Sequence, residues 1–244
     1  MPLTVKSGHF HWSASWLMTL LTLVAVVLFV RLGFWQWHRA QEKTAQQQAF
    51  AAGGRTVAEP ASDSTDALPR YAQVRLEGSY DGAHQFLLDN LSHDGRPGYE
   101  VLTPLRLAGG HLLMVNRGWL PMTAPRSQLP DIRLDHATPL SVTGRLDNLP
   151  VVGISLGHVP PPSGTAWPKV TSFPTTADLS AALGAPLQTR QLLLAPAEPF
   201  GYVRDWQMSG FGPGRHLSYA VQWWGFATLA VVLYAYMNWQ RSVR

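Results

Sequence analysis

Two long apolar segments lie towards opposite ends of the chain, and they constrain its fold more than any other feature. Residues 16–30 read WLMTLLTLVAVVLFV, and the apolar character continues beyond Arg31 to Trp37. At about 1.5 Å per residue, a helix over these residues crosses the roughly 30 Å hydrocarbon core of a bilayer if Arg31 snorkels to one surface. The second segment, Leu217–Trp239, carries no charged side chain and is long enough without such help. The sequence therefore predicts a membrane protein with two transmembrane helices.

Tryptophan placement and charge content agree with two spans. Charged residues make up 14% of the chain, against about 25% in an average soluble domain, as expected if part of the chain lies in lipid. Indole rings favour the membrane–water interface, although two of these tryptophans, Trp223 and Trp224, can instead pack between helices. Seven of the ten tryptophans lie in or beside the two segments: Trp12, Trp16, Trp35, Trp37, Trp223, Trp224 and Trp239.

These limits predict five regions along the chain. They are a flexible tail over 1–13, a first span over 14–37, a β-rich extracytoplasmic domain over 38–214, a second span over 215–239 and a tail over 240–244. Within the domain, a linker occupies 45–68, and Lys43–Ala52 can continue the first helix. The residues after the first apolar run are too bulky for a signal-peptide cleavage site, so we expect the first span to be retained. Arg and Lys flank both ends of the first span, so charge alone does not decide the orientation.

The region between the spans alternates short β-prone runs with turn residues, which predicts a mainly antiparallel barrel or sandwich with its own core. Turn chemistry is concentrated in Ser92–Gly98 and Gly109–Gly110. One short helix is expected over Thr176–Leu183, capped by Thr175 or Thr176 and stopped by Gly184. The predicted strands are Ala72–Gly78, Gln85–Leu88, Tyr99–Leu107, Leu112–Trp119, Ser141–Leu146 and Thr189–Leu194.

Several classes of function find no support in the sequence. The chain has no cysteine, which excludes disulfides and thiolate metal sites. A serine–lysine peptidase needs a lysine beside its nucleophile; Lys169 lies in no such motif, and we interpret it as a solvated charge. Common hydrolase and nucleotide motifs are missing, so no enzymatic activity is expected. The net charge is only +4 and its basic residues are dispersed, so no nucleic-acid partner is expected either.

The histidines of the tail and the central domain form no recognisable ligand set. His9 and His11 are close in sequence, but they lie in the expected flexible tail. The others stand singly at strand edges or turns, where a hydrogen-bonded surface histidine is the ordinary interpretation: His84, His93, His111, His136 and His158.

The beginning of the second span is the strongest candidate site. An ionisable residue at the threshold of a span is a functional candidate, and His216 lies there. At helical spacing His216, Tyr219, Ala220 and Trp223 share one face, so an imidazole with a small residue one turn deeper can ligate a haem iron beside aromatic walls. A structural or helix-capping histidine fits the same pattern. Spacing alone leaves the two interpretations open.

Three blocks of sequence resemble the surfeit locus protein 1 family. The first is LGFWQWHRAQEK at residues 32–43, which is similar to the L-G-x-W-Q-x-x-R…K signature that ends the family's first span. The second joins GYEVLTPL at 98–105 to VNRGWLP at 115–121. The third, HLSYAVQW at 216–223, resembles the family's H-x-x-Y-A-x-x-W at the start of the second span. The blocks occur in the family's order across nearly the whole chain.

This resemblance implies a cytochrome c oxidase assembly factor of the respiratory chain, a non-enzymatic chaperone in a bacterial inner membrane. Family members are thought to assist the delivery of haem A to oxidase subunit I, or its retention there, so the implied cofactor is haem A. The implied partners are subunit I, haem A synthase and membrane lipid. The termini are then cytoplasmic and the central domain periplasmic. A haem-free membrane scaffold that stabilises an assembly intermediate is the alternative.

The resemblance also assigns expected roles to residues in the three blocks. His216 is the expected axial ligand of the haem iron, with Tyr219 and Trp223 as aromatic walls. Gln36 and Arg39 meet either haem propionates or lipid headgroups, and Trp35 either stacks on the porphyrin or anchors the helix at the interface. His38 is a less favoured candidate for a second axial ligand.

The internal block has mainly structural interpretations. Arg117 either pairs with a carboxylate in the domain or meets a haem propionate near the membrane surface, and the structural role is preferred. Gly118 is expected to permit an unusual backbone angle, and Asn116 to bond the turn.

Overall fold

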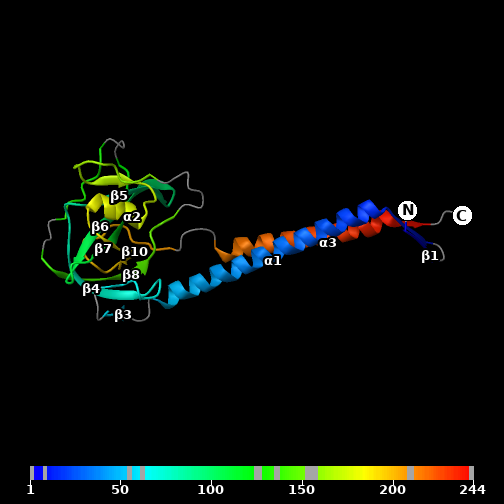
Figure 1. The fold of residues 1–244 in the computed structure, drawn as a ribbon, viewed down its shortest axis with the longest axis horizontal. Coiled ribbons are helices and arrows are strands. Elements are labelled where there is room, and N and C mark those ends of the chain that lie inside the picture. Colours follow the sequence, from blue (N-terminus) through cyan, green and yellow to red (C-terminus); the bar gives the residue numbers. More distant parts are fainter. Residues whose placement is uncertain are drawn as a thin grey trace. The chain divides into compact units, whose positions relative to one another are not determined.

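A computed structural model describes residues 3–7, 10–53, 57–60, 64–123, 128–134, 138–151, 159–207 and 212–241. The chain forms two compact units (Figure 1). The first, the helical unit, comprises Met1–Gln48 and Gly210–Arg244, and the second, the β unit, comprises Ala49–Ser209.

Two long helices make up most of the helical unit. Helix α1 spans Trp16–Ala52 and helix α3 spans Pro213–Asn238, and they run side by side in opposite directions (Figure 1). Both are long and apolar enough to cross a membrane, with mean hydropathies of 2.4 and 1.3 over their most apolar windows. Only 6% and 11% of those windows are buried, so the apolar side chains face outward, unlike those of a helix in a soluble core. The two predicted spans are therefore confirmed as long, outward-facing apolar helices.

Small residues and aromatic rings hold α1 and α3 together. Gly33 and Ala40 of α1 and Ala220 and Ala227 of α3 are buried, although most side chains of both helices face outward. A Cβ atom on Gly33 would lie 2.3 Å from Nε1 of Trp224, so the indole occupies the space that the glycine leaves.

Both tryptophans of α3 pack against α1. The Trp223 ring stacks on Phe29 at 5.7 Å between centroids, and the Trp224 ring meets Phe34 edge-on at 5.6 Å. Further along the pair, Thr19 Oγ1 and Tyr234 Oη are 2.6 Å apart. These contacts match the interpretation in which Trp223 and Trp224 pack between helices.

The ends of the helical unit differ from the sequence prediction. Strands β1 (Leu3–Ser7) and β2 (Phe10–Ala14) pair antiparallel, and β11 (Trp239–Arg241) adds to β2. The prediction of a flexible tail is therefore wrong for the residues of β1 and β2. The antiparallel helices bring the two ends of the chain close enough for β2 and β11 to pair. Helix α1 continues to Ala52, as predicted for Lys43–Ala52, so the first part of the expected linker is helical.

A closed five-stranded barrel forms the centre of the β unit. Its order is β4 (Gln73–Tyr80), β8 (Leu140–Asp147), β10 (Leu187–Leu194), β7 (Leu112–Pro121) and β6 (Arg96–Leu107), and pairing of β4 with β6 closes it. Only β10 and β7 are parallel among these neighbours. Strand β5 (Phe86–His93) extends the sheet beyond β6, and two short strands, β3 (Val57–Ala58) and β9 (Lys169–Thr171), pair with β4 and β5. The structure thus selects the barrel over the sandwich.

Alternating apolar residues of the barrel strands form the main core. The cluster includes Val74, Leu105, Val115, Val142 and Leu192, all at most 1% exposed. Helix α2 (Thr176–Leu183) buries Leu179 against a second cluster beside the barrel. Its predicted caps are confirmed: the Thr175 side chain accepts from the Asp178 backbone N–H, and Gly184 ends the helix at φ 66°.

The predicted strands are present, and most extend further than predicted. The hairpin between β5 and β6 reaches into the expected turn at Ser92–Gly98, because Asp94 and Gly95 adopt φ 49° and 74° and close it with two residues.

Candidate functional site

A hydrogen bond between α1 and α3 marks the candidate site. His216 is the fourth residue of α3, and its ring is half-buried in the helical unit. Its Nδ1 atom lies 2.8 Å from Oε1 of Gln36 on α1, 180 positions away in the chain. The structure therefore joins two residues that the sequence analysis singled out separately.

This contact fixes how the imidazole of His216 is used. An amide oxygen only accepts hydrogen bonds, so the Nδ1–H of His216 donates to Gln36. In the neutral ring the other nitrogen, Nε2, then carries a lone pair. Among the described residues Nε2 has no hydrogen-bond partner, so it is the atom that can ligate a metal.

The neighbours of His216 on α3 do not share one environment. The Tyr219 side chain is 45% exposed, and Trp223 is half-buried on Phe29, so both keep surface that a ligand can reach. The expectation that Ala220 leaves room for a macrocycle is wrong, because Ala220 is fully buried where the two helices pack. A flat ligand on His216 must therefore lie beside the helix contact.

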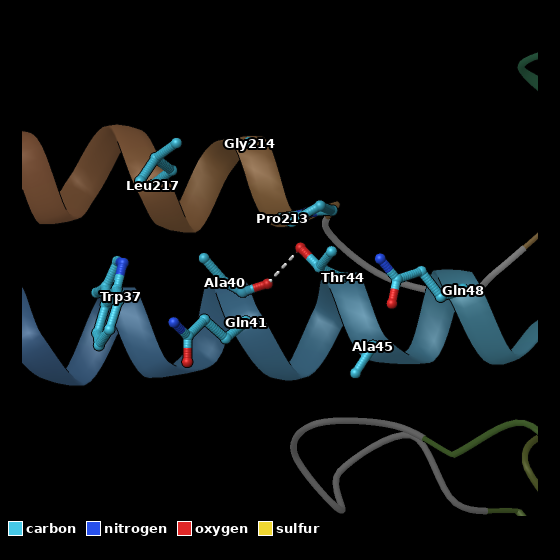
Figure 2. Close-up of a pocket in the computed structure, with 9 residues that line it drawn as sticks. All are labelled: Trp37, Ala40, Gln41, Thr44, Ala45, Gln48, Pro213, Gly214 and Leu217. Atoms are coloured by element: carbon cyan, nitrogen blue, oxygen red, sulfur yellow. Dashed lines mark hydrogen bonds between the residues drawn. The ribbon is translucent and has the colours of Figure 1, made fainter.

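An apolar groove between α1 and α3 is lined by Trp37 and Leu217, the residues that follow Gln36 and His216 in the sequence (Figure 2). Its volume is about 470 Å³, within the range of small-molecule sites. The Thr44 hydroxyl donates to the Ala40 carbonyl at 2.9 Å, so this polar group is satisfied inside the helix (Figure 2). The groove is lined by Trp37, Ala40, Gln41, Thr44, Ala45 and Gln48 of α1 and by Pro213, Gly214 and Leu217 of α3.

The other candidates on α1 do not converge on His216. Trp35 is 54% exposed, which leaves both stacking and anchoring open. Arg39 is exposed and forms an ion pair with Glu42 at 2.8 Å. His38 lies against Trp37, 5.2 Å between ring centroids, and is about 200° around the helix from Gln36. The structure therefore does not bring His38 and His216 together as a pair of ligands.

Arg117 lies in the β unit, where its side chain is 3% exposed. Its Nε donates to the Phe200 carbonyl at 2.7 Å, and its Nη1 donates to Gln85 Oε1 at 2.8 Å. The guanidinium also lies over the Tyr202 ring, and burial lowers the pKa of Arg117. These contacts tie β7 to two loops of the same unit. The expected carboxylate partner is wrong, because the acceptors are carbonyl and amide oxygens.

The residues on either side of Arg117 behave as expected. Gly118 has φ 107°, and a Cβ there would lie 2.5 Å from the Val203 carbonyl oxygen. Oδ1 of Asn116 accepts from the Gly118 N–H at 3.1 Å, and its Nδ2 donates to Glu100 Oε2 at 2.6 Å. Burial raises the pKa of Glu100, with the Asn116 hydrogen bond opposing that rise.

Lys169 differs from its predicted environment. Its side chain is 4% exposed, and its Nζ donates to the Pro162 and Gly164 carbonyls at 2.7 and 2.8 Å. The interpretation of Lys169 as a solvated charge is therefore wrong, because a proline-rich loop folds over it and solvates the ammonium in place of water.

The remaining histidines show no metal site in the part of the chain that the structure describes. His84 Nδ1 contacts the Asp81 carboxylate at 2.8 Å, His93 lies 3.6 Å from Asp94, and His111 is exposed. No group of three or more potential ligands occurs among the described residues. His9, His136 and His158 lie outside them.

Sequence reasoning missed two contacts that define the helical unit. Gly33 was recognised only as part of a signature, yet it accommodates Trp224, and Gln36 was assigned to propionates or headgroups, yet it binds His216. The spacing of Gly33, Gln36 and Ala40 by three and four residues places them on one helix face. The two small residues on this face, Gly33 and Ala40, could have indicated that it packs against another helix.

Comparison with known proteins identifies the family. Residues 23–228 match the SURF1 family; the match covers most of the chain, including parts of both long helices and the whole barrel. The chain belongs to the SURF1 family. SURF1 proteins are associated with the assembly of cytochrome oxidase. The resemblance carried by the three sequence blocks is thereby confirmed.

Individual SURF1 relatives are distant. A SURF1-like protein of Rickettsia felis is 28% identical over 102 residues, which are 41% of this chain and 45% of the relative. Uncharacterized SURF1-like proteins of Mycobacterium bovis and Mycobacterium tuberculosis are 28% identical over 174 residues, which are 71% of this chain and 62% of each relative. The chain thus matches less than two thirds of the length of each of these relatives.

Proposed function

We propose that this SURF1 protein is a membrane-anchored biogenesis factor of cytochrome c oxidase that binds haem A through His216. It assists the delivery of haem A to oxidase subunit I, or its retention there, without itself catalysing a reaction. The observation that carries the proposal is the hydrogen bond from His216 Nδ1 to Gln36, which leaves Nε2 available as a ligand.

The residues around His216 fit a haem held by one histidine. A metal-ligating histidine commonly donates its second ring nitrogen to a fixed acceptor, as His216 does. The accessible ring surfaces of Tyr219 and Trp223 offer apolar contacts to a flat macrocycle. When bound, haem A supplies the redox-active iron that the oxidase requires. His216 would be the residue that holds the iron, through its Nε2 atom.

The membrane location follows from the two helices in this proposal. Helices α1 and α3 span the inner membrane of a bacterium, with the termini in the cytoplasm and the β unit in the periplasm. Their exposed apolar side chains contact lipid, and the partners are oxidase subunit I and haem A synthase.

An absorption spectrum of the full chain tests the function directly. The protein is purified in mild detergent from a host that makes haem A, and its haem is extracted and identified. We expect a Soret band with haem and protein in near-equal amounts. A colourless preparation from the same host would overturn haem binding and favour the haem-free scaffold.

A further inference from the structure

We propose that Gln36 is a positioning residue for His216: its amide oxygen holds the proton on Nδ1 and so presents Nε2 to the ligand. The inference deepens the proposed function and rests on it for the ligand. It concerns a residue of the first helix that touches no ligand itself.

The distance and the chemistry of the two groups support this assignment. At 2.8 Å the contact is a full-strength hydrogen bond between the imidazole Nδ1 and the amide oxygen. A neutral histidine has two tautomers, and the one present is set by the hydrogen bond that one nitrogen makes. Because Gln36 Oε1 cannot donate, it selects the tautomer with hydrogen on Nδ1.

The packing around the pair fixes where Gln36 points. On α1, Gln36 lies between two buried residues, Gly33 and Ala40, on the face that contacts α3. On α3, Ala220 is fully buried one turn beyond His216. The amide therefore sits on a rigid helix pair, as an orienting partner must if it is to hold the imidazole ring in place.

Three variants of the full chain separate positioning from folding. Gln36→Leu removes the acceptor while keeping a helix-forming side chain of similar size. Gln36→Glu restores an acceptor of the same length, as in carboxylate–histidine–metal arrangements. Gln47→Leu is the matched control, because Gln47 is an exposed glutamine on the same helix and does not line the groove.

The first measurement is made without haem. Histidine labelled with ¹⁵N is incorporated into the chain in detergent micelles, and the His216 signals are identified by their loss in His216→Ala. We expect hydrogen on Nδ1 and none on Nε2 in the wild type and Gln47→Leu, and a shift towards the other tautomer in Gln36→Leu. An unchanged tautomer in Gln36→Leu, with the helices still formed, would overturn the proposal.

The second measurement is a titration of each apoprotein with haem A. We expect Gln36→Leu to bind 10–100-fold more weakly, the loss typical of a removed orienting partner, with a changed ligand-field spectrum. Gln36→Glu should bind within a few-fold of the wild type. Equal affinity and an unchanged spectrum in Gln36→Leu would contradict a positioning role. If the wild type binds no haem A, the proposed function fails, and the ¹⁵N tautomer still decides the role of Gln36.

Discussion

Burying a charged side chain in the β unit costs desolvation free energy, and here uncharged hydrogen-bond partners offset part of it. Arg117 is almost fully buried, yet its closest acceptors are the Phe200 carbonyl and the Gln85 amide oxygen. Glu100 lies on the neighbouring strand β6, where its carboxylate accepts a hydrogen bond from the Asn116 side-chain amide at 2.6 Å. Because Asn116 also accepts from the Gly118 N–H, one side chain links the carboxyl of Glu100 to the positive-φ backbone of Gly118 within β7.

Glu100 makes the stability of the β unit depend on pH. Burial raises its pKa in the folded chain above the value of about 4.3 in an unfolded chain. As pH rises from that value, the unfolded chain releases its proton first, so the folded state is destabilised until its own raised pKa is passed. Glu100→Gln keeps an acceptor for Asn116 and removes this effect.

We therefore expect Glu100→Gln to be more stable than the wild type at pH 7 and to lose that advantage near pH 4. The measurement is urea unfolding of the full chain in detergent, followed by circular dichroism of the sheet. Glu77→Gln, at an exposed position on β4, is the control and should show no such pH-dependent difference. A Glu100→Gln curve parallel to the wild type at both pH values would contradict the assignment.

At the scale of elements, the contact between α1 and α3 depends on a glycine. The Trp224 indole fills the space beside Gly33, so any side chain at that position must displace it. Gly225, one residue further on α3, has no atom within 4 Å of its Cβ position. Gly225 is therefore a suitable control for Gly33: both are helical glycines, but only Gly33 is crowded by a side chain of the other helix.

We expect Gly33→Ala to destabilise the helix pair by about 1–3 kcal/mol, the usual cost of overpacking a close contact. Gly225→Ala should be neutral or slightly stabilising, because alanine favours a helix. Unfolding by sodium dodecyl sulfate, followed by near-ultraviolet circular dichroism of the tryptophans, measures both. Equal stability of Gly33→Ala and Gly225→Ala would show that Trp224 does not fill this space.

Most helices and strands of the β unit could be predicted from sequence patterns. Alternation and turn residues predicted the strands around the barrel core, and Thr175 and Gly184 predicted the limits of α2. Strands β3 and β9 were missed because two or three residues carry no periodicity, and their pairing depends on neighbours distant in sequence. The environment of Ala220 was predicted wrongly because a single-helix pattern does not reveal which helix covers the small residue.

For the whole chain, the direction in which the two antiparallel helices cross a membrane decides on which side the β unit lies. Basic residues flank both ends of the first span, so the charge rule favours neither direction. The contact between His216 and Gln36 could not be predicted from the sequence either. Helical spacing shows on which face of a helix a residue lies, but not which residue of another helix it contacts.

We expect the β unit on the periplasmic side. Alkaline phosphatase, which is active only outside the cytoplasm, is fused after Glu59 in one chain and after Arg244 in another. The first fusion should be active and the second inactive, with both present in equal amounts in the membrane. The reverse pattern of activity would place the β unit in the cytoplasm and contradict the topology.

A comparison of two histidine variants tests whether His216 ligates haem iron. His216→Ala removes the imidazole whose Nε2 is available, whereas His38→Ala removes an exposed ring that lies against Trp37. Both full chains are purified from a host that makes haem A, and the Soret absorbance per protein is measured. We predict that His216→Ala inserts normally and loses its haem, while His38→Ala keeps it. Full haem occupancy in His216→Ala, with an unchanged ligand-field spectrum, would contradict the account.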